Sequence, residues 1–257
     1  MSRISEAFKD NKAFIPFITC GDPDIETTKA CIHEMVKNGA DVIELGIPFS
    51  DPTAEGPVIQ GANLRALEAG TTTDDIFDMV TELRRDISIP FVIMTYSNVV
   101  FSYGTETFIK KAKDAEIDGL ILADLPFEEK EDFLPCCREY GIELISLIAP
   151  TSENRIGEIA RNAEGFVYIV SSLGVTGVRS KITTDINRIV GHVRENTSIP
   201  CAIGFGISTP RQAAEMSEMA DGVIIGSAII KIIAEHGKES PAYVGEYVRS
   251  ITEAINR

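Results

Sequence analysis

The chain has 257 residues, of which 44% are apolar, and a formal net charge of −15. This length fits one large α/β domain or two small ones, and the acidic balance argues against nucleic acid or an acidic membrane as a partner. The longest apolar run near the N-terminus, residues 13–20, is too short to span a membrane and lacks a signal-peptide pattern. We therefore expect a soluble, cytoplasmic protein. Its five cysteines form no CxxC pair, which predicts reduced thiols and no metal site.

Short apolar runs recur along the whole chain and predict buried strands. They are rich in Val, Ile, Phe and Leu, and their continuous apolar character indicates burial on both faces, as in a parallel sheet. The runs are FIPFIT (14–19), VIEL (42–45), FVIMTY (91–96), GLILA (119–123), LISLIA (144–149), FVYIV (166–170), CAIGF (201–205) and GVIIG (222–226).

Stretches with helical periodicity separate these runs. The predicted helices cover residues 25–38, 58–69, 72–86, 105–115, 128–140, 154–161, 185–195 and 209–219. Strands and helices alternating in this number predict an α/β fold, a single-domain (β/α)8 TIM barrel over residues 1–257 with an extra helical insertion after the second strand. An open doubly wound sheet is the alternative, but it usually has fewer strands in this length, and no GxGxxG follows the first strand.

Two carboxylates near the end of the second predicted strand are the main candidates for chemistry. Active sites of such barrels lie at the carboxyl ends of the strands and in the loops that follow. Glu44 lies inside an apolar run, where an acid is costly to bury, and Glu55 lies on the Pro-rich loop beyond it. Carboxylates in unlike settings can hold different protonation states, which suits general acid/base catalysis. The alternatives are a buried acid satisfied by its neighbours and a solvated loop acid.

Few other reactive groups accompany these carboxylates. No predicted strand ends in Lys or His, which disfavours a Schiff-base aldolase, metal-dependent aldol chemistry and His-assisted isomerisation. Asp124 and Tyr168 lie within reach at other strand ends. Asp124 has two interpretations: it caps a helix that begins near Phe127, or it holds the catalytic groups or the substrate.

Glycines in the last third of the chain predict a phosphate site and a lid. The segment 204–206 precedes a helix that begins near Ser208, and residues 226–227 open the helical run 228–233. Glycines let a backbone approach an anion, and helix N-termini present free N–H groups to it. The loop 171–180 contains glycines that can act as hinges and bring Thr176 into the site. The alternatives are plain strand-to-helix turns and an ordinary surface loop.

Six motifs, in order along the chain, together resemble the tryptophan synthase alpha subunit family. They are PFITCGDP (16–23), ELGIPFSDPTAEGP (44–57), ADLP (123–126), LGVTG (173–177), GFGIS (204–208) and GSAIIKII (226–233). The resemblance implies reversible retro-aldol cleavage of indole-3-glycerol phosphate to indole and glyceraldehyde 3-phosphate. It also implies a tryptophan synthase beta subunit as partner in an α2β2 tetramer. The partner receives the indole and carries pyridoxal phosphate, while the alpha chain itself needs no cofactor.

The resemblance also assigns roles to single residues. Glu44 matches the family's principal catalytic glutamate, and its apolar strand should raise its pKa. Glu55 stands where the family has an aspartate that hydrogen-bonds the indole N–H, so the charge is kept on an arm one methylene longer. Pro48 and Asp51 match the loop that touches the beta subunit.

The other matches concern the substrate. They are Phe17, Met94, Ile121, Ala123, Leu147 and Ile224 for the apolar wall around the indole ring, Tyr168 near the scissile region, Thr176 as the lid residue that contacts Asp124, and Gly177, Phe205, Gly206, Gly226 and Ser227 for the phosphate cradle.

Two other functions compete with this one. Another phosphate-binding barrel enzyme, such as an isomerase or indole-glycerol-phosphate synthase, would need differently placed Lys, His or Cys groups. A ligand-binding activator of the beta chain, with weak catalysis of its own, is favoured only by Glu55 in place of the family aspartate. The intact Pro48 and Asp51 favour work in the complex over a lyase that acts alone.

Overall fold

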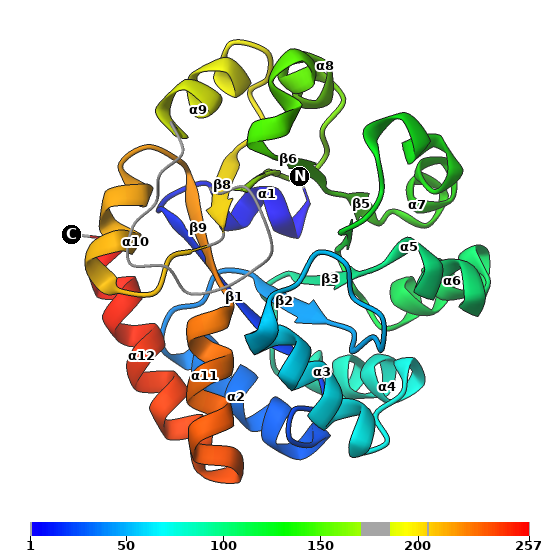
Figure 1. Ribbon diagram of the computed structural model, residues 1–257, viewed down its shortest axis with the longest axis vertical. Helices are drawn as coiled ribbons and strands as arrows, with labels where there is room; N and C mark the ends of the chain where they lie inside the picture. Colours follow the sequence, from blue (N-terminus) through cyan, green and yellow to red (C-terminus); the bar gives the residue numbers. More distant parts are fainter. Residues whose placement is uncertain (1, 171–185, 205, 257) are drawn as a thin grey trace.

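Parallel strands form the centre of the molecule, and helices surround them (Figure 1). The computed structural model describes residues 2–170, 186–204 and 206–256. Within these ranges nine strands form one sheet in the order β5-β4-β3-β2-β1-β9-β8-β7-β6. The strands are β1 (Ala13–Thr19), β2 (Ile43–Gly46), β3 (Phe91–Thr95), β4 (Gly119–Leu122), β5 (Glu143–Leu144), β6 (Ser146–Ile148), β7 (Val167–Val170), β8 (Cys201–Gly204) and β9 (Gly222–Ile225).

The predicted fifth strand is divided between its two neighbours. β5 pairs with β4, and β6 pairs with β7, so the run 144–149 is not the single strand that its apolar character predicts. Ile145 is the point of division, because its N–H still donates to the Leu120 carbonyl at 2.9 Å. Since β5 and β6 are consecutive and stand at opposite ends of the strand order, the sheet curls into a nearly closed barrel. The predicted TIM-barrel class is confirmed.

Helices follow the strands around the outside. They are α1 (Arg3–Ala7), α2 (Ile25–Lys37), α3 (Pro57–Glu68), α4 (Thr73–Leu83), α5 (Ser97–Tyr103), α6 (Thr105–Asp114), α7 (Leu134–Tyr140), α8 (Ile156–Arg161), α9 (Ile186–Arg194), α10 (Pro210–Ser217), α11 (Ser227–His236) and α12 (Ser240–Ile255), with 3-10 turns η1 (Phe127–Asp132), η2 (Pro150–Arg155) and η3 (Gly237–Glu239). The insertion after β2 contains α3 and α4, as predicted. The predicted helix 128–140 is instead η1 followed by α7, and the predicted helix 154–161 is the end of η2 followed by α8.

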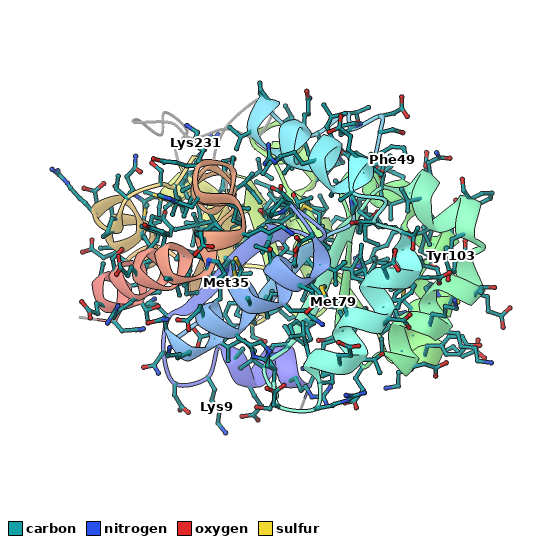
Figure 2. The ribbon with its side chains drawn as sticks, turned by 90° about the horizontal axis from the view of Figure 1, so that it is seen from below. Lys9, Met35, Phe49, Met79, Tyr103 and Lys231 are labelled. Atoms are coloured by element: carbon teal, nitrogen blue, oxygen red, sulfur yellow. The ribbon has the colours of Figure 1, made fainter. Side chains whose placement is uncertain are left out.

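The main core lies between the strands and the helices. On α2 the buried positions Thr28, Cys31, Ile32 and Met35 follow the i, i+3, i+4, i+7 spacing of one helical face. In Figure 2, Met35 and Met79 lie in this inner layer, whereas the exposed Lys9 points away from it. No helix of the described ranges is long and apolar enough to cross a membrane.

A smaller core fills the inside of the barrel. Its members come from α1, from β1, β3, β4, β7, β8 and β9, and from positions next to strands, and they are Ile4, Ile15, Val42, Val92, Ile121, Ile145, Phe166, Tyr168, Ala202 and Ile224. These side chains close the barrel below the carboxyl ends of the strands, so the space for a ligand lies above them.

Helix α3 is tied to the loop after β1 by a partly buried ion pair. Arg65 donates from Nε and Nη2 to the two carboxylate oxygens of Asp22 at 2.7 and 2.8 Å, and Asp22 is fully buried. A bidentate pair of this kind fixes orientation as well as distance. Gly21, at φ +84°, packs so closely on Thr71 that an added Cβ would lie 2.0 Å from its Oγ1. These contacts hold α3 over the carboxyl ends of the strands.

Candidate active site

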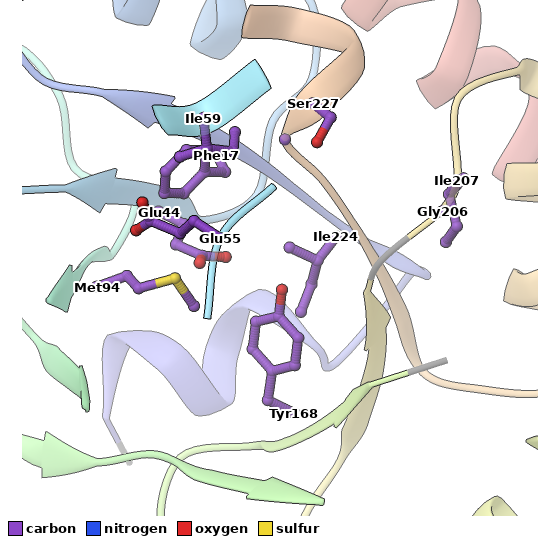
Figure 3. Close-up of a pocket in the computed structure, with 11 residues that line it drawn as sticks. Phe17, Glu44, Glu55, Ile59, Met94, Tyr168, Gly206, Ile207, Ile224 and Ser227 are labelled. Atoms are coloured by element: carbon purple, nitrogen blue, oxygen red, sulfur yellow. The ribbon is translucent and has the colours of Figure 1, made fainter. Parts of the chain in front are cut away.

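A pocket with about 500 Å³ of open space lies at the carboxyl ends of the strands. We call it the strand-end pocket. Its lining residues are Phe17, Glu44, Glu55, Ile59, Met94, Tyr168, Gly206, Ile207, Ile224, Gly226 and Ser227 (Figure 3). A barrel places its active site at this end, and a mostly apolar cleft with a few polar groups is the usual form of a small-molecule site.

Glu44 is buried in this pocket, at the carboxyl end of the barrel. It lies on β2 between Phe17 of β1 and Val92 of β3, and it is 1% exposed. Neither carboxyl oxygen has a partner among the described residues. Burial raises the pKa of Glu44 to about 8, because the charged form is not solvated there. Glu44 therefore carries its proton at neutral pH and can both give and take one.

The raised pKa predicts a pH-dependent contribution to stability. Between the pKa of the unfolded chain, 4.5, and the folded value of about 8, the folded state keeps a proton that the unfolded state releases. The contribution of Glu44 to the free energy of unfolding therefore falls as pH rises through this window, by roughly 5 kcal/mol in all. A Glu44→Gln variant has no such titration. Urea unfolding of both proteins from pH 5 to 9 should show the free energy of unfolding of the variant rising relative to that of the wild type up to about pH 8. A difference between the two free energies that does not change with pH would contradict the buried, protonated Glu44.

Glu55 reaches the same pocket from the loop that follows β2. Its carboxylate accepts a hydrogen bond from Asn63 Nδ2 at 2.6 Å, one that crosses from the loop to the second turn of α3. The Tyr96 hydroxyl accepts from the Ala54 N–H at 3.0 Å and so holds the loop beside Glu55. Burial raises the pKa of Glu55, while hydrogen bonds from Asn63 and Tyr96 oppose this rise. In Figure 3 the two glutamates lie close together in the pocket, held in different surroundings.

Three glycines make room for the two aromatic rings of the pocket. A Cβ on Gly46 would lie 2.6 Å from Phe17 Cζ, and one on Gly226 would lie 3.0 Å from Phe17 Cδ1. A Cβ on Gly204 would lie 2.6 Å from the Tyr168 hydroxyl oxygen. Gly204 was expected in the phosphate site, but it is absent from the pocket lining, and the Tyr168 ring covers it.

Substitution at Gly204 should therefore act through Tyr168. Gly204→Ala is expected to destabilise the protein by about 1–3 kcal/mol, because the buried Tyr168 ring has to move out of the way. Gly191→Ala is the matched control, since nothing lies within 4 Å of a Cβ in this exposed position on α9. The control should stabilise the protein by up to about 1 kcal/mol through helix propensity. Urea unfolding measures both, and equal effects would contradict the close contact.

Comparison with known proteins decides the family. Residues 4–255 match the family model described as tryptophan synthase alpha chain. The chain belongs to this family. A tryptophan synthase alpha chain from Lacticaseibacillus casei is 46% identical over 256 residues, which cover 100% of this chain and 96% of the relative.

Solved structures of the family share the fold. Tryptophan synthase subunit alpha from Legionella pneumophila is 36% identical with a TM-score of 0.89, and the match covers 99% of this chain and 98% of that one. A structure of the tryptophan synthase a2b2 complex from Pyrococcus furiosus matches at 35% identity and a TM-score of 0.87, over 95% of this chain and 98% of that one.

The pocket brings together many of the residues that resemble the alpha chain's site. Those that line it are Phe17, Glu44, Glu55, Met94, Tyr168, Gly206, Ile224, Gly226 and Ser227. Thr176, Gly177 and Phe205 lie outside the described residues, as does the predicted lid 171–180.

Four expected substrate contacts are not among the residues that line the strand-end pocket. Ile121 is fully buried in the core inside the barrel, and Leu147 lines a separate cavity. Ala123 is half-buried, and its N–H donates to the Thr95 carbonyl. Asp124 is exposed, and it accepts from the Ser97 N–H at 2.8 Å and the Ser97 hydroxyl at 3.0 Å. It thus holds the first turn of α5, and its interpretation as a cap near Phe127 is wrong, because η1 has no side-chain cap.

Sequence reasoning missed three residues of the site. Ile59 and Ile207 line the pocket, and Asn63 holds Glu55. The signal for Asn63 is its spacing, since Ile59, Ala62, Asn63 and Ala66 form the buried face of α3. A buried amide on an otherwise apolar face needs a partner. No group of three or more His, Cys, Asp or Glu side chains in the described ranges is placed to hold a metal ion.

Proposed function

We propose that this chain is a carbon–carbon lyase that cleaves indole-3-glycerol phosphate reversibly to indole and glyceraldehyde 3-phosphate. The observation that carries the proposal is Glu44, a carboxyl group without a partner in the described structure, whose raised pKa lets it work as acid and base at neutral pH. Membership of the tryptophan synthase alpha chain family supports the same reaction.

The two glutamates divide the chemistry. Protonated Glu44 gives its proton to the indole carbon that bears the glycerol chain, and positive charge develops on the ring nitrogen. The Glu55 carboxylate accepts a hydrogen bond from the indole N–H and stabilises that charge. Ionised Glu44 then takes the proton of the glycerol hydroxyl next to the ring. The carbon–carbon bond breaks, its electrons return to the ring, and indole and an aldehyde result.

The pocket walls suit the two ends of this substrate. Phe17, Met94 and Ile224 offer an apolar surface to a flat indole ring. Gly206, at φ +84°, and the start of α11 at Gly226 and Ser227 would hold the phosphate. Backbone N–H groups in the first turn of a helix have no partner within the helix and favour an anion. This local site explains how a chain of charge −15 binds a phosphate.

A beta subunit is the proposed partner, in an α2β2 tetramer that passes indole from one chain to the other. The Pyrococcus furiosus relative is such an a2b2 complex. On the loop that follows β2, Asp51 is exposed and Pro48 is buried. Phe101 on α5 and Leu64 on α3 are 72% and 58% exposed. Large exposed apolar side chains are typical of docking surfaces. Pyridoxal phosphate would belong to the beta subunit, and the chain itself would need no cofactor.

Indole release from indole-3-glycerol phosphate tests the proposal. The purified chain is assayed alone and with a cognate beta subunit. We expect turnover that rises when the partner is added. No turnover in either condition would refute the lyase. If ligand binding to the chain still raised the activity of the beta subunit, the result would instead identify an activator.

A further inference from the structure

A second cavity lies where β4 and β6 part, and we call it the seam cavity. Its open space is about 340 Å³, and it shares no lining residue with the strand-end pocket. Leu122 of β4 and Leu144 of β5 form one side, and Phe127 of η1 and Ile159 of α8 form others. The backbone pairing of β4 with this segment ends at Ile145, and these side chains line the space beyond it.

The polar end of this apolar cavity is a buried lysine. Lys130 is 6% exposed, and its Nζ donates to the Ser146 hydroxyl at 3.1 Å and to the Asn162 carbonyl at 3.0 Å. Both Lys130 and Ser146 line the cavity. An ammonium group has three protons to donate, so this arrangement leaves one for a further acceptor.

No acid neutralises this ammonium group within the described residues. The nearby Glu164 accepts instead from Arg138 Nε at 2.8 Å and from the Leu144 N–H at 3.3 Å. Burial lowers the pKa of Lys130, and the charge of Glu164 opposes this fall only in part. A buried cation with neutral partners alone is costly, and an anion brought to it offsets that cost.

We propose that the seam cavity binds a small apolar carboxylate. The carboxylate pairs with Lys130 and the Ser146 hydroxyl, and the hydrocarbon body packs on Leu122, Phe127 and Ile159. One ammonium group in an otherwise apolar cavity matches a singly charged acid and not a phosphate, which brings two charges and needs several donors. The open space is smaller than that of the strand-end pocket, which favours a small hydrocarbon body.

Phenylacetate and its uncharged analogue phenylacetamide are the probes. Titration calorimetry with the full chain should show that phenylacetate binds at least about tenfold more tightly than phenylacetamide, because only the acid forms a charge-assisted hydrogen bond. Lys130→Met keeps the length and apolar contact of the side chain and should remove this preference. Ser146→Ala should weaken phenylacetate binding by less. Equal binding of the two probes, or an unchanged preference in Lys130→Met, would overturn the proposal.

Crystals of the wild-type chain grown with phenylacetate locate the site without any variant. Density in the seam cavity beside Lys130 supports the proposal. Density confined to the strand-end pocket beside Glu44, or none at all, refutes it. Neither result bears on the lyase proposal, because the indole assay contains no phenylacetate.

Discussion

Glu44→Gln should lower the rate of indole release by about 10²–10⁴-fold while leaving phosphate-ligand binding intact. The amide has nearly the shape of the protonated acid, so it fits the pocket where the carboxyl oxygens make no hydrogen bond to the described residues. It has no proton to give at neutral pH and cannot take one. The loss should therefore fall on kcat, with little change in the affinity for glycerol phosphate.

The wild-type pH profile gives an independent check. If the protonated Glu44 starts the reaction, kcat/KM should fall as pH rises through about 8. In Glu44→Gln this limb of the profile should vanish from whatever activity remains. Near-normal turnover in the variant would remove Glu44 from its proposed role, and the chemistry would then have to come from Glu55.

Much of the barrel was predictable because burial on both faces leaves a continuous apolar run in the sequence. The runs at 14–19, 42–45 and 222–226 agree with β1, β2 and β9 to within one residue at each end. The division of the run 144–149 was not predictable, since apart from Ser146 its side chains are apolar and no Gly or Pro interrupts it. Which neighbour each half pairs with depends on the curvature of the whole sheet. Helix α12, absent from the predicted helices, packs its buried face mainly on α2 and α10.

The residues of the candidate site were likewise predictable only in part. An acid in an apolar strand identifies Glu44 from the sequence, because its burial needs a reason. The partner of Glu55 comes from a helix turn eight positions further on, and no local pattern joins the two. Leu147, expected at the indole wall, lines the seam cavity and also packs against the core inside the barrel.

Glu55→Ala should reduce indole release by about 10²-fold or more, while Glu55→Asp should keep activity within about tenfold of the wild type. Alanine removes the charge that stabilises the indole nitrogen as it becomes positive. Aspartate restores the charge on the arm that the family uses. An unaffected Glu55→Ala variant would show that the loop carboxylate plays no part in the reaction.

Asn63 explains how the longer arm of Glu55 can be accommodated. Its Nδ2 donates to one carboxylate oxygen at 2.6 Å, so the carboxylate keeps a fixed position despite the extra methylene. Asn63→Ala should then lower kcat more in the wild type, where it frees the longer arm, than in Glu55→Asp. A double-mutant cycle on kcat measures this difference, and contacting residues of this kind usually show coupling of about 0.5–3 kcal/mol. Strict additivity would mean that Asn63 stabilises α3 and the loop without directing the carboxylate.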